Sequence, residues 1–390
     1  MPALVLFLVL MITLTGSTAA HAGGPGDALV GQVAAEVGVY ADTNTTTCVT
    51  PVVSAKVENV LSGWGVSGSF AVDVVSTASA DIVATASPRW RELRYAPALG
   101  GHHRFGDADV ALRASLSSEP DYLSVAGGGT FSIDLAGKTV TPGVSYDFAH
   151  DTLGRAGTPF SLFSRPIQRH SLAAGVALVL GKSTLFIPTL SAQFEIGDTS
   201  KPYRHVPMFG AAAADAVTPG MSAADVDAIR LDLRPLEQLP KQRQRWALDA
   251  VLLHRFARST LRLEERLYQD TWGLRASTTD ARVLFDVGEH LRLGTHARLH
   301  AQTAVSFWQL AYVARSTSQG LLVPALRTGA RELGPLVTPT GGLDLRIPIG
   351  PGRRLALTLG GEVGYTRFLD HLFIRDRVSF LGTTMMEAEL

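Results

Sequence analysis

Two adjacent pairs have the residue types that act as general acids and bases in hydrolases, His150-Asp151 and Asp370-His371. Both pairs fall in or near segments that we expect to be loops. Neither is accompanied by a recognisable nucleophile, and the motif Gly-x-Ser-x-Gly does not occur in the sequence. We therefore assign no catalytic residue and keep a hydrolase only as a distant alternative.

Metal and cofactor chemistry have little support. His296 and His300 share a strand face, but four residues along a strand is about 13 Å, too far to bind one ion without a third element between them. Cys48 is the single cysteine, which excludes an internal disulfide and a cysteine-rich metal site. The glycines at 127–129 are expected at a barrel bend or where a loop packs close, rather than in a phosphate loop. We predict no metal and no cofactor.

The composition limits the elements that can position these residues. Hydrophobic residues make up 46% of the 390 residues and charged residues 18%, and Lys+Arg equals Asp+Glu at 35 each. So much apolar surface excludes a disordered chain. The lack of a basic excess argues against a nucleic-acid partner.

The first residues have the pattern of a signal peptide. Residues 3–14 are an unbroken apolar run, and Ala20-His21-Ala22 is a small-x-small cleavage pattern, although no Lys or Arg precedes the run. The run is shorter than the roughly 20 apolar residues that cross a bilayer. We expect a signal peptide at 1–22, cleavage after Ala22, and a mature chain of 23–390 without a transmembrane helix.

The apolar residues of the mature chain alternate with polar ones. In 291–307, Leu293, Leu299 and Phe307 share one parity, whereas Arg292 and Arg298 share the other. A period of two predicts a strand, because successive side chains of a strand point to opposite faces. The same alternation recurs along most of the chain, so we predict an all-β protein.

Short and long connections also alternate between these strands. Seven short, turn-like segments alternate with eight connections that are mostly longer, which defines about 16 strands of about ten residues or more. An even strand number with this alternation is typical of a transmembrane antiparallel up-and-down β-barrel. The short turns are expected at 61–63, 105–107, 136–138, 181–183, 257–259, 288–290 and 350–352. The other connections are expected at 42–47, 77–88, 118–121, 151–165, 197–241, 270–273, 309–336 and 367–376.

A secreted sandwich or propeller would also alternate. The outward face of a sandwich meets water and should be charged, whereas the apolar parity of this sequence is long and nearly uncharged. No blade-like repeat of about 40 residues is present either. We therefore favour the membrane barrel.

Three local features qualify the strand pattern. The loop 197–241 contains a capping box at 222–225, which predicts one short helix over 226–233. The segment 73–79 is echoed by 81–87, which we interpret as a duplicated strand end rather than as a loop folded into the lumen. Pro142 and Pro188 fall inside strands, at bulges near the short turns if the strand boundaries hold.

If the apolar parity faces lipid, the polar parity faces the lumen. Arginines and carboxylates on neighbouring strands, such as Arg266, Asp270 and Asp286, predict a ladder of cross-strand ion pairs. The charges either pair and fill the interior, which we favour, or line a wet and weakly selective channel. The candidate lumen-lining residues are Asp73, Arg113, Asp147, Glu195, Arg262, Glu264, Arg266, Arg282, Arg292, His296, Arg298, His300 and Glu362.

Several short motifs resemble a family of predicted Gram-negative outer-membrane barrels catalogued only as a domain of unknown function. The resemblance rests on DVVSTASADIVATAS at 73–87, HDTLGR at 150–155, GTPF at 157–160, PYRHVP at 202–207 and YQDTWG at 268–273. It covers nearly the whole mature chain and implies location and fold, but no activity. Outer-membrane lipid and the barrel-insertion machinery are the implied partners, although Leu390 stands where such barrels usually end in an aromatic residue.

Three functions are consistent with these observations. A porin-like channel or uptake route for a small solute in the outer membrane is favoured. A plugged barrel with a structural or surface-interaction role is the alternative, and an outer-membrane hydrolase is a distant third. Alternation alone predicts no particular oligomer.

Overall fold

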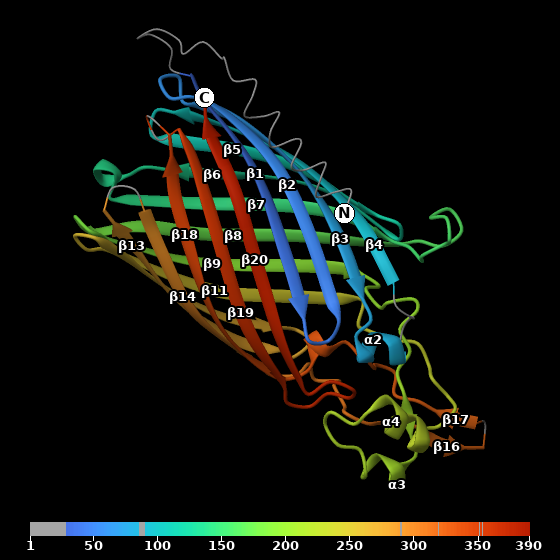
Figure 1. Ribbon diagram of the computed structural model, residues 1–390. Coiled ribbons are helices and arrows are strands. Elements are labelled where there is room, and N and C mark those ends of the chain that lie inside the picture. Colours follow the sequence, from blue (N-terminus) through green and yellow to red (C-terminus); the bar gives the residue numbers. More distant parts are fainter. Residues whose placement is uncertain (1–28, 86–89, 289–290, 319, 351, 353) are drawn as a thin grey trace.

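The computed structural model describes residues 29–85, 90–288, 291–318, 320–350, 352 and 354–390. Sixteen strands form a closed barrel in which each strand pairs antiparallel with the next, and the first strand pairs with the last (Figure 1). This confirms the predicted all-β up-and-down barrel of 16 strands. The expected signal peptide at 1–22, with its cleavage after Ala22, lies outside the described residues.

The barrel strands have 12 to 17 residues, long enough to cross a bilayer at a tilt. They are β1 (Leu29–Asp42), β2 (Thr46–Asn59), β3 (Trp64–Thr77), β4 (Trp90–Phe105), β5 (Ala108–Glu119), β6 (Tyr122–Ile133), β7 (Val140–Leu153), β8 (Arg165–Gly181), β9 (Thr184–Gly197), β11 (Gln242–Arg255), β12 (Ser259–Asp270), β13 (Arg275–Val287), β14 (Leu291–Gln302), β18 (Leu336–Ile349), β19 (Leu355–Phe368) and β20 (Asp376–Glu389).

Period-two alternation gives the barrel an apolar face and a charged face. Leu99, Leu112 and Leu190 lie on the apolar face with 69%, 67% and 59% of their surface exposed. Such large apolar side chains do not pack against one another in a core. The apolar face is therefore the outer surface of a transmembrane barrel, where lipid takes the place of water.

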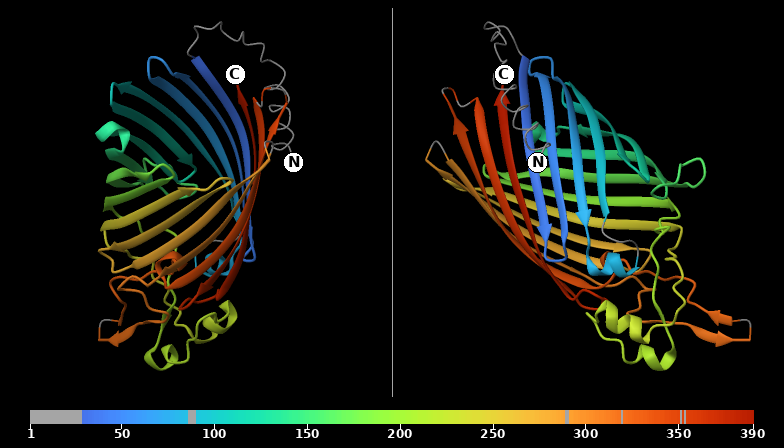
Figure 2. Two further views of the ribbon diagram at one scale, coloured as in Figure 1. Left: turned by 90° about the vertical axis from the view of Figure 1, so that its left-hand side faces the viewer. Right: turned by 45° about the vertical axis from the view of Figure 1, so that its right-hand side comes forward.

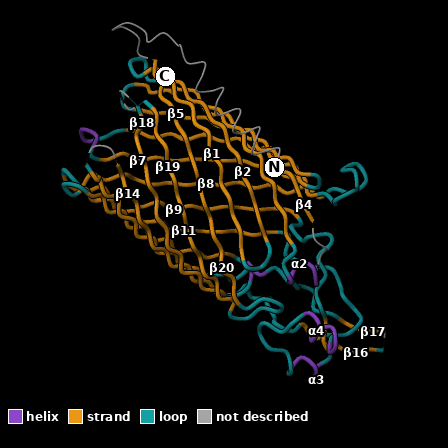
Figure 3. The backbone as a smooth tube through the Cα atoms, in the orientation of Figure 1, coloured by secondary structure: helices purple, strands orange, loops and turns teal. Residues whose placement is uncertain are grey.

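The short turns and the long loops lie at opposite ends of the barrel (Figure 3). The start of β1 and the end of β20 lie at the short-turn end, together with the short helix η1 (Ala136–Lys138). Among the described residues, no helix is both long and apolar enough to cross a membrane; the longest, α4, has seven residues.

The long loops fold together at and beyond one end of the barrel (Figure 2). We call the described residues of 78–85, 198–241, 303–335 and 369–375 the cap. Its elements are α2 (Ala80–Thr85), β10 (Met208–Phe209), α3 (Ala211–Ala214), α4 (Ala223–Ile229), β15 (Tyr312–Val313), β16 (Arg315–Thr317), β17 (Gly320–Leu322) and η2 (Arg331–Leu333).

Most of the buried apolar side chains of the protein belong to the cap rather than to the barrel. Met208 and Phe209 are fully buried, and β10 pairs in parallel with β15, which joins the loop 198–241 to the loop 303–335. Tyr312 of β15 packs with Met208, whereas Phe209 packs with Leu372 of the loop between β19 and β20. The cap is therefore a small folded body with its own core.

The cap crosses the mouth of the barrel. α2 lies between β3 and β4, and the loop that contains Trp272 joins β12 to β13, eight strands further round the ring. Arg331 lies 3.5 Å from Asp81 of α2. Leu333, in the same short helix, belongs to the same buried cluster as Trp272 and Val305. A segment that contacts loops on opposite sides of a ring must bridge its opening.

Three sequence-based predictions are wrong in detail. β14 ends at Gln302, so the alternation that continues to Phe307 is not strand; Val305 is instead buried in the cap. The capped helix α4 has the predicted N-cap Ser222 but ends at Ile229, before residue 233. The echo at 81–87 is not a second strand end, because residues 80–85 form α2.

Candidate functional site

The charged face of the barrel strands carries all 13 predicted lumen-lining residues. Three pairs among them come together: Arg113 with Asp147, Arg262 with Glu264, and His296 with Glu362. The other members take partners that the sequence-based set did not include. Asp73 pairs with Arg94 at 2.6 Å, Glu195 with Arg245 at 3.2 Å, and Arg266 with Asp249 at 2.9 Å.

Glycine allows three pairs on the charged face to form across an intervening strand, one of them between His102 and Glu58, which lie outside the predicted set. In each case a glycine stands in register between the two partners, and a Cβ atom added to it would overlap a partner's side chain. The N···O distances are 3.7 Å for His102–Glu58, 2.6 Å for Arg113 Nε–Asp147 and 3.1 Å for His296–Glu362. The three sets are Glu58–Gly65–His102, Arg113–Gly128–Asp147 and His296–Gly342–Glu362.

Two aspartates on β13 each hold two arginines. Asp280 accepts hydrogen bonds from Nε of Arg282 and Nε of Arg298, both at 2.9 Å. Near the short-turn end, Asp286 accepts one from Arg255 at 2.5 Å and one from Arg292 at 3.1 Å.

The predicted ladder of ion pairs is therefore present, with partners that differ from simple strand neighbours. Arg262 stands opposite Arg282 in register but pairs along its own strand with Glu264. Asp280 was missed by the sequence analysis, although it shares the parity of Arg282 and lies two residues before it. Alternation places both side chains on one face, but it does not say which charges meet.

The two histidines of β14 have separate partners. His296 Nε2 lies 3.1 Å from Glu362, without hydrogen-bond geometry. His300 shares hydrogen bonds with Thr278 at 2.7 Å and with Gln302 at 3.2 Å. Among the described residues, no side chain contacts both His296 and His300 in a hydrogen bond or ion pair.

The two histidine–carboxylate pairs do not form acid–base dyads among the described contacts. His150 and Asp151 are consecutive on β7, so their side chains point to opposite faces, and Asp151 pairs with Arg169 at 2.5 Å. His371 is buried in the cap against Trp308 and Phe368, and Asp370 accepts a hydrogen bond from Trp308 at 3.2 Å.

One acidic cluster lies where the strands meet the cap. Glu92, Glu119 and Asp121 have ligand-type atoms within 4.8 Å of one another. The hydroxyl of Tyr203, in the cap, donates to Asp121 at 3.4 Å. Acidic side chains gather in this way without a metal, so the cluster alone does not define a site.

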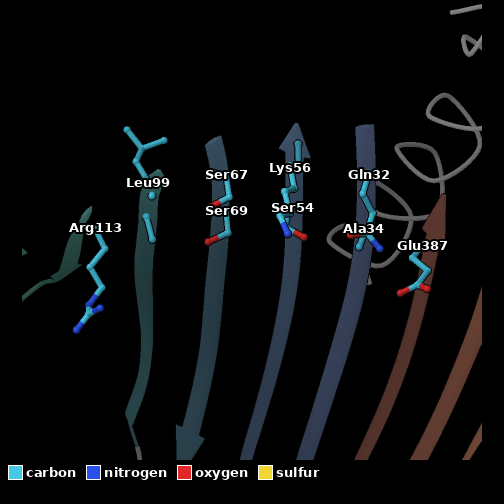
Figure 4. Close-up of a pocket in the computed structure, with 13 residues that line it drawn as sticks. Gln32, Ala34, Ser54, Lys56, Ser67, Ser69, Leu99, Arg113 and Glu387 are labelled. Atoms are coloured by element: carbon cyan, nitrogen blue, oxygen red, sulfur yellow. The ribbon is translucent and has the colours of Figure 1, made fainter. Parts of the chain in front are cut away.

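Pockets hollow the barrel wall among the described residues. One pocket of about 450 Å³ lies along β20 and β1 to β5, with Glu387 at one side, Arg113 at the other, and Lys56 and several serines between them (Figure 4). A second, of about 250 Å³, lies along β7 to β12 and is lined in part by Ser171, Arg245 and Tyr268. The lining of each pocket mixes polar and apolar side chains.

Solved structures resemble the chain only weakly. OccAB1 of Acinetobacter baumannii is 10% identical, with a TM-score of 0.46, and the match covers 96% of this chain and 100% of that one. A bacterial polysaccharide outer membrane secretin is 9% identical, with a TM-score of 0.45 and coverage of 93% and 98%. The siderophore receptor PirA of Acinetobacter baumannii is 7% identical, with a TM-score of 0.42, and the match covers 88% of this chain but only 54% of the receptor. The chain thus spans about half the length of that receptor.

No curated protein matches the sequence. A family model described as "Protein of unknown function (DUF3570)" matches residues 14–357, which is most of the chain. The match agrees with the resemblance noted in the motifs at 73–87 and 150–155. The chain belongs to the DUF3570 family of proteins of unknown function.

Proposed function

We propose that this protein is a channel in the bacterial outer membrane for passive passage of small hydrophilic solutes. The observation that carries the proposal is the exposure of the charged face. Arg113, Arg282 and Arg292 keep 46%, 45% and 53% of their side-chain surface exposed although each is ion-paired. Charges that filled the interior would be buried, so paired charges with open space before them indicate a wet lumen.

The physics of the wall supports the same proposal. An ionised side chain in an apolar environment is strongly disfavoured, so half-exposed guanidinium groups need water beside them. A closed barrel of 16 strands is wide enough for an aqueous path when its interior is not filled by side chains. The glycines at 65, 128 and 342 reduce the side-chain volume on the charged face further.

A closed barrel with a surface-interaction role is the second candidate, and the cap favours it. The cap crosses the mouth, and its contacts tie loops on opposite sides of the ring. In the channel proposal the solute passes around the cap, or passes through it when the cap moves. In the alternative the cap keeps the mouth shut and itself contacts the surroundings of the cell.

Single-channel recording distinguishes the two candidates. We expect stepwise currents in KCl when the purified full-length protein is added to a planar lipid bilayer. The currents should disappear when the protein is heat-denatured before addition. A bilayer that holds inserted protein and yet carries no steps at any voltage would contradict the channel and support the closed barrel.

Location and processing need their own measurement. We expect the protein to co-fractionate with outer-membrane markers on a sucrose gradient, and the mature chain to begin at Gly23 by N-terminal sequencing. Recovery in the inner membrane, or an uncleaved leader, would contradict the proposed location.

A further inference from the structure

We propose that the arginine pair held by Asp280 is a binding site for small solutes that bear an oxyanion, such as a carboxylate or phosphate group. The inference rests on the proposed function, since the solute must reach the charged face. We call Arg282, Arg298 and Asp280 the arginine clamp. It lies on the neighbouring strands β13 and β14.

The clamp has a buried anion and exposed cations. The Asp280 side chain is 5% exposed, whereas those of Arg282 and Arg298 are 45% and 38% exposed. A short aspartate stays close to the wall, and a long arginine carries its charge away from it. A solute approaching this part of the wall therefore meets guanidinium groups before it meets the carboxylate.

The geometry leaves hydrogen-bond donors free to face a ligand. Asp280 accepts a hydrogen bond from Nε of Arg298 at 2.9 Å. No described hydrogen bond uses the two terminal nitrogens of Arg298. Arg282 uses Nε and Nη2 for Asp280, at 2.9 and 3.3 Å, and its Nη1 has no described partner. One carboxylate thus holds two guanidinium groups together while their outer N–H groups remain available, which is the donor arrangement that oxyanions prefer.

The clamp itself has one positive charge in excess, although two further carboxylates lie near it. Arg262, in register with Arg282, is paired one to one with Glu264 at 2.5 Å. Glu362 lies 3.1 Å from His296, and Glu362 and Glu264 also attract Arg282 through their charges. Asp280 pairs with both Arg282 and Arg298, so the clamp has one positive charge that its own carboxylate does not neutralise. Bringing the two cations together is unfavourable without an anion, and a bound oxyanion supplies the second negative charge.

The same arrangement occurs again near the short-turn end of the barrel. There Asp286, 26% exposed, holds Arg255 and Arg292, which are 47% and 53% exposed. Asp344 leans over Gly294, two residues from Arg292 on β14. We therefore place the principal site at Asp280, where the carboxylate is deeper.

Benzoate and benzamide provide a matched test, because they have nearly the same shape and differ in charge. Added to the bilayer bath, benzoate should reduce the single-channel current of the wild-type protein at a concentration about tenfold lower than benzamide does. Arg298→Gln leaves Asp280 paired with Arg282 and should remove most of that difference. Arg104→Gln, which removes a single ion pair with Asp134 elsewhere on the charged face, should leave it unchanged.

Arginine footprinting tests the site without any current. Phenylglyoxal modifies exposed arginines, and inorganic phosphate should slow its reaction with Arg282 and Arg298 about fivefold or more relative to chloride at equal ionic strength. Arg104, which pairs with Asp134 and is 41% exposed, should show no such protection. Protection without channel activity would sink the proposed function and keep the site. Equal block by benzoate and benzamide, unchanged preference in Arg298→Gln, or equal reaction rates in phosphate and chloride would each overturn the site.

Discussion

At the scale of single residues, glycine decides which charges on the wall can meet. Arg113 and Asp147 stand on strands that are not neighbours, and the strand between them contributes Gly128 at the same register. A side chain there would occupy the space that the Asp147 carboxylate fills. Gly128 therefore serves packing on the charged face, whereas Gly127 and Gly129 lie on the opposite parity.

Gly128→Ala should destabilise the barrel by about 1–3 kcal/mol, because the new methyl group must displace the Asp147 carboxylate and the carbonyl of Tyr146. Gly127→Ala is the matched control. Its Cβ would lie 3.6 Å from the nearest atom, an ordinary contact, and alanine is the better strand residue of the two. Urea unfolding in detergent micelles, followed by tryptophan fluorescence, measures both. Equal losses in the two variants would contradict the packing argument.

Glu265 is a carboxylate on the apolar face. It is the seventh of the 12 residues of β12, between the exposed Leu263 and Leu267. Ser277 and Thr279 of β13 donate hydrogen bonds to it at 2.7 and 2.5 Å. These hydroxyl groups reduce, but do not remove, the unfavourable free energy of a charge that faces lipid.

Glu265→Gln should therefore raise the free energy of unfolding in lipid bilayers by about 1 kcal/mol, because the charge is lost while the amide oxygen still accepts from one hydroxyl and the amide NH2 donates to the oxygen of the other. Glu264→Gln on the adjacent position should not have this effect, because Glu264 lies on the charged face and pairs with Arg262. Reversible unfolding from vesicles of neutral lipid measures the difference. A loss of stability in Glu265→Gln would show that the carboxylate is not exposed to lipid.

At the scale of elements, the cap is a second folded body built from loops. The sequence indicated only one feature of it, the capping box of α4, because that signal is local. The parallel pairing of β10 with β15 joins segments about a hundred residues apart in short strands of two residues each, for which alternation gives no signal. The prediction that 81–87 is a second strand end failed for a related reason. Nearly the same letters form a strand in β3 and a helix in α2, so contacts outside the segment decided its structure.

A buried carboxylate links the two longest loops of the cap. Glu237 is 3% exposed, accepts a hydrogen bond from Thr328 at 2.6 Å, and lies 3.4 Å from Arg204, which is also largely buried. Glu237→Gln should loosen the cap by about 3 kcal/mol, because it leaves the Arg204 charge buried without its partner. Hydrogen exchange over 198–241 and 303–335 should accelerate while exchange in the barrel strands stays unchanged.

Asp227→Asn gives the control for this experiment, because its ion pair with Arg230 is on the surface and contributes at most about 1 kcal/mol. If the cap limits passage, the loosened variant should also show longer open times in the bilayer than either the wild type or Asp227→Asn. Equal exchange in the two variants would mean that Glu237 does not hold the cap.

The cap should also respond to acid. Burial lowers the pKa of His371 below its ordinary value of 6.5. The unfolded cap therefore binds more protons than the folded one in mildly acidic solution, so the stability of the cap is complete above about pH 6.5 and falls as the pH drops below it. Hydrogen exchange of 369–374, corrected for intrinsic rates, should accelerate between about pH 7.5 and about pH 5. His371→Gln should abolish this dependence, and the same dependence in that variant would assign it to another group.

At the scale of the whole molecule, alternation predicts the barrel but does not predict which charges on its wall pair with each other. Alternation, turn residues and an even strand number specify a closed antiparallel barrel, and the strand bounds follow within a few residues. Pro142 and Pro188 remain inside strands near the short turns, where a lost ladder hydrogen bond is tolerated. The partners of Arg262 and Asp280 depend on side-chain reach across a curved sheet, which no sequence pattern records.

The orientation of the two faces is the property on which the channel and the clamp both depend. We expect single cysteines along β5, in a Cys48→Ser background, to react alternately with a charged, membrane-impermeant thiol reagent added to proteoliposomes. Ser115 and Ser117 lie on the parity of Arg113, so Ser115→Cys and Ser117→Cys should react rapidly. Ala114→Cys lies on the parity of the exposed Leu112 and should be protected by lipid.

Unfolding in urea provides the internal control for that experiment, because it exposes both faces of the strand to water. All three cysteines should react at similar rates in urea and differ by about tenfold or more in the folded state. Reaction at Ala114→Cys alone would place the charges toward lipid, which is energetically untenable for so many arginines. Protection of all three cysteines would mean that the interior is dry. That result would contradict both the passage of solutes and their binding at Asp280.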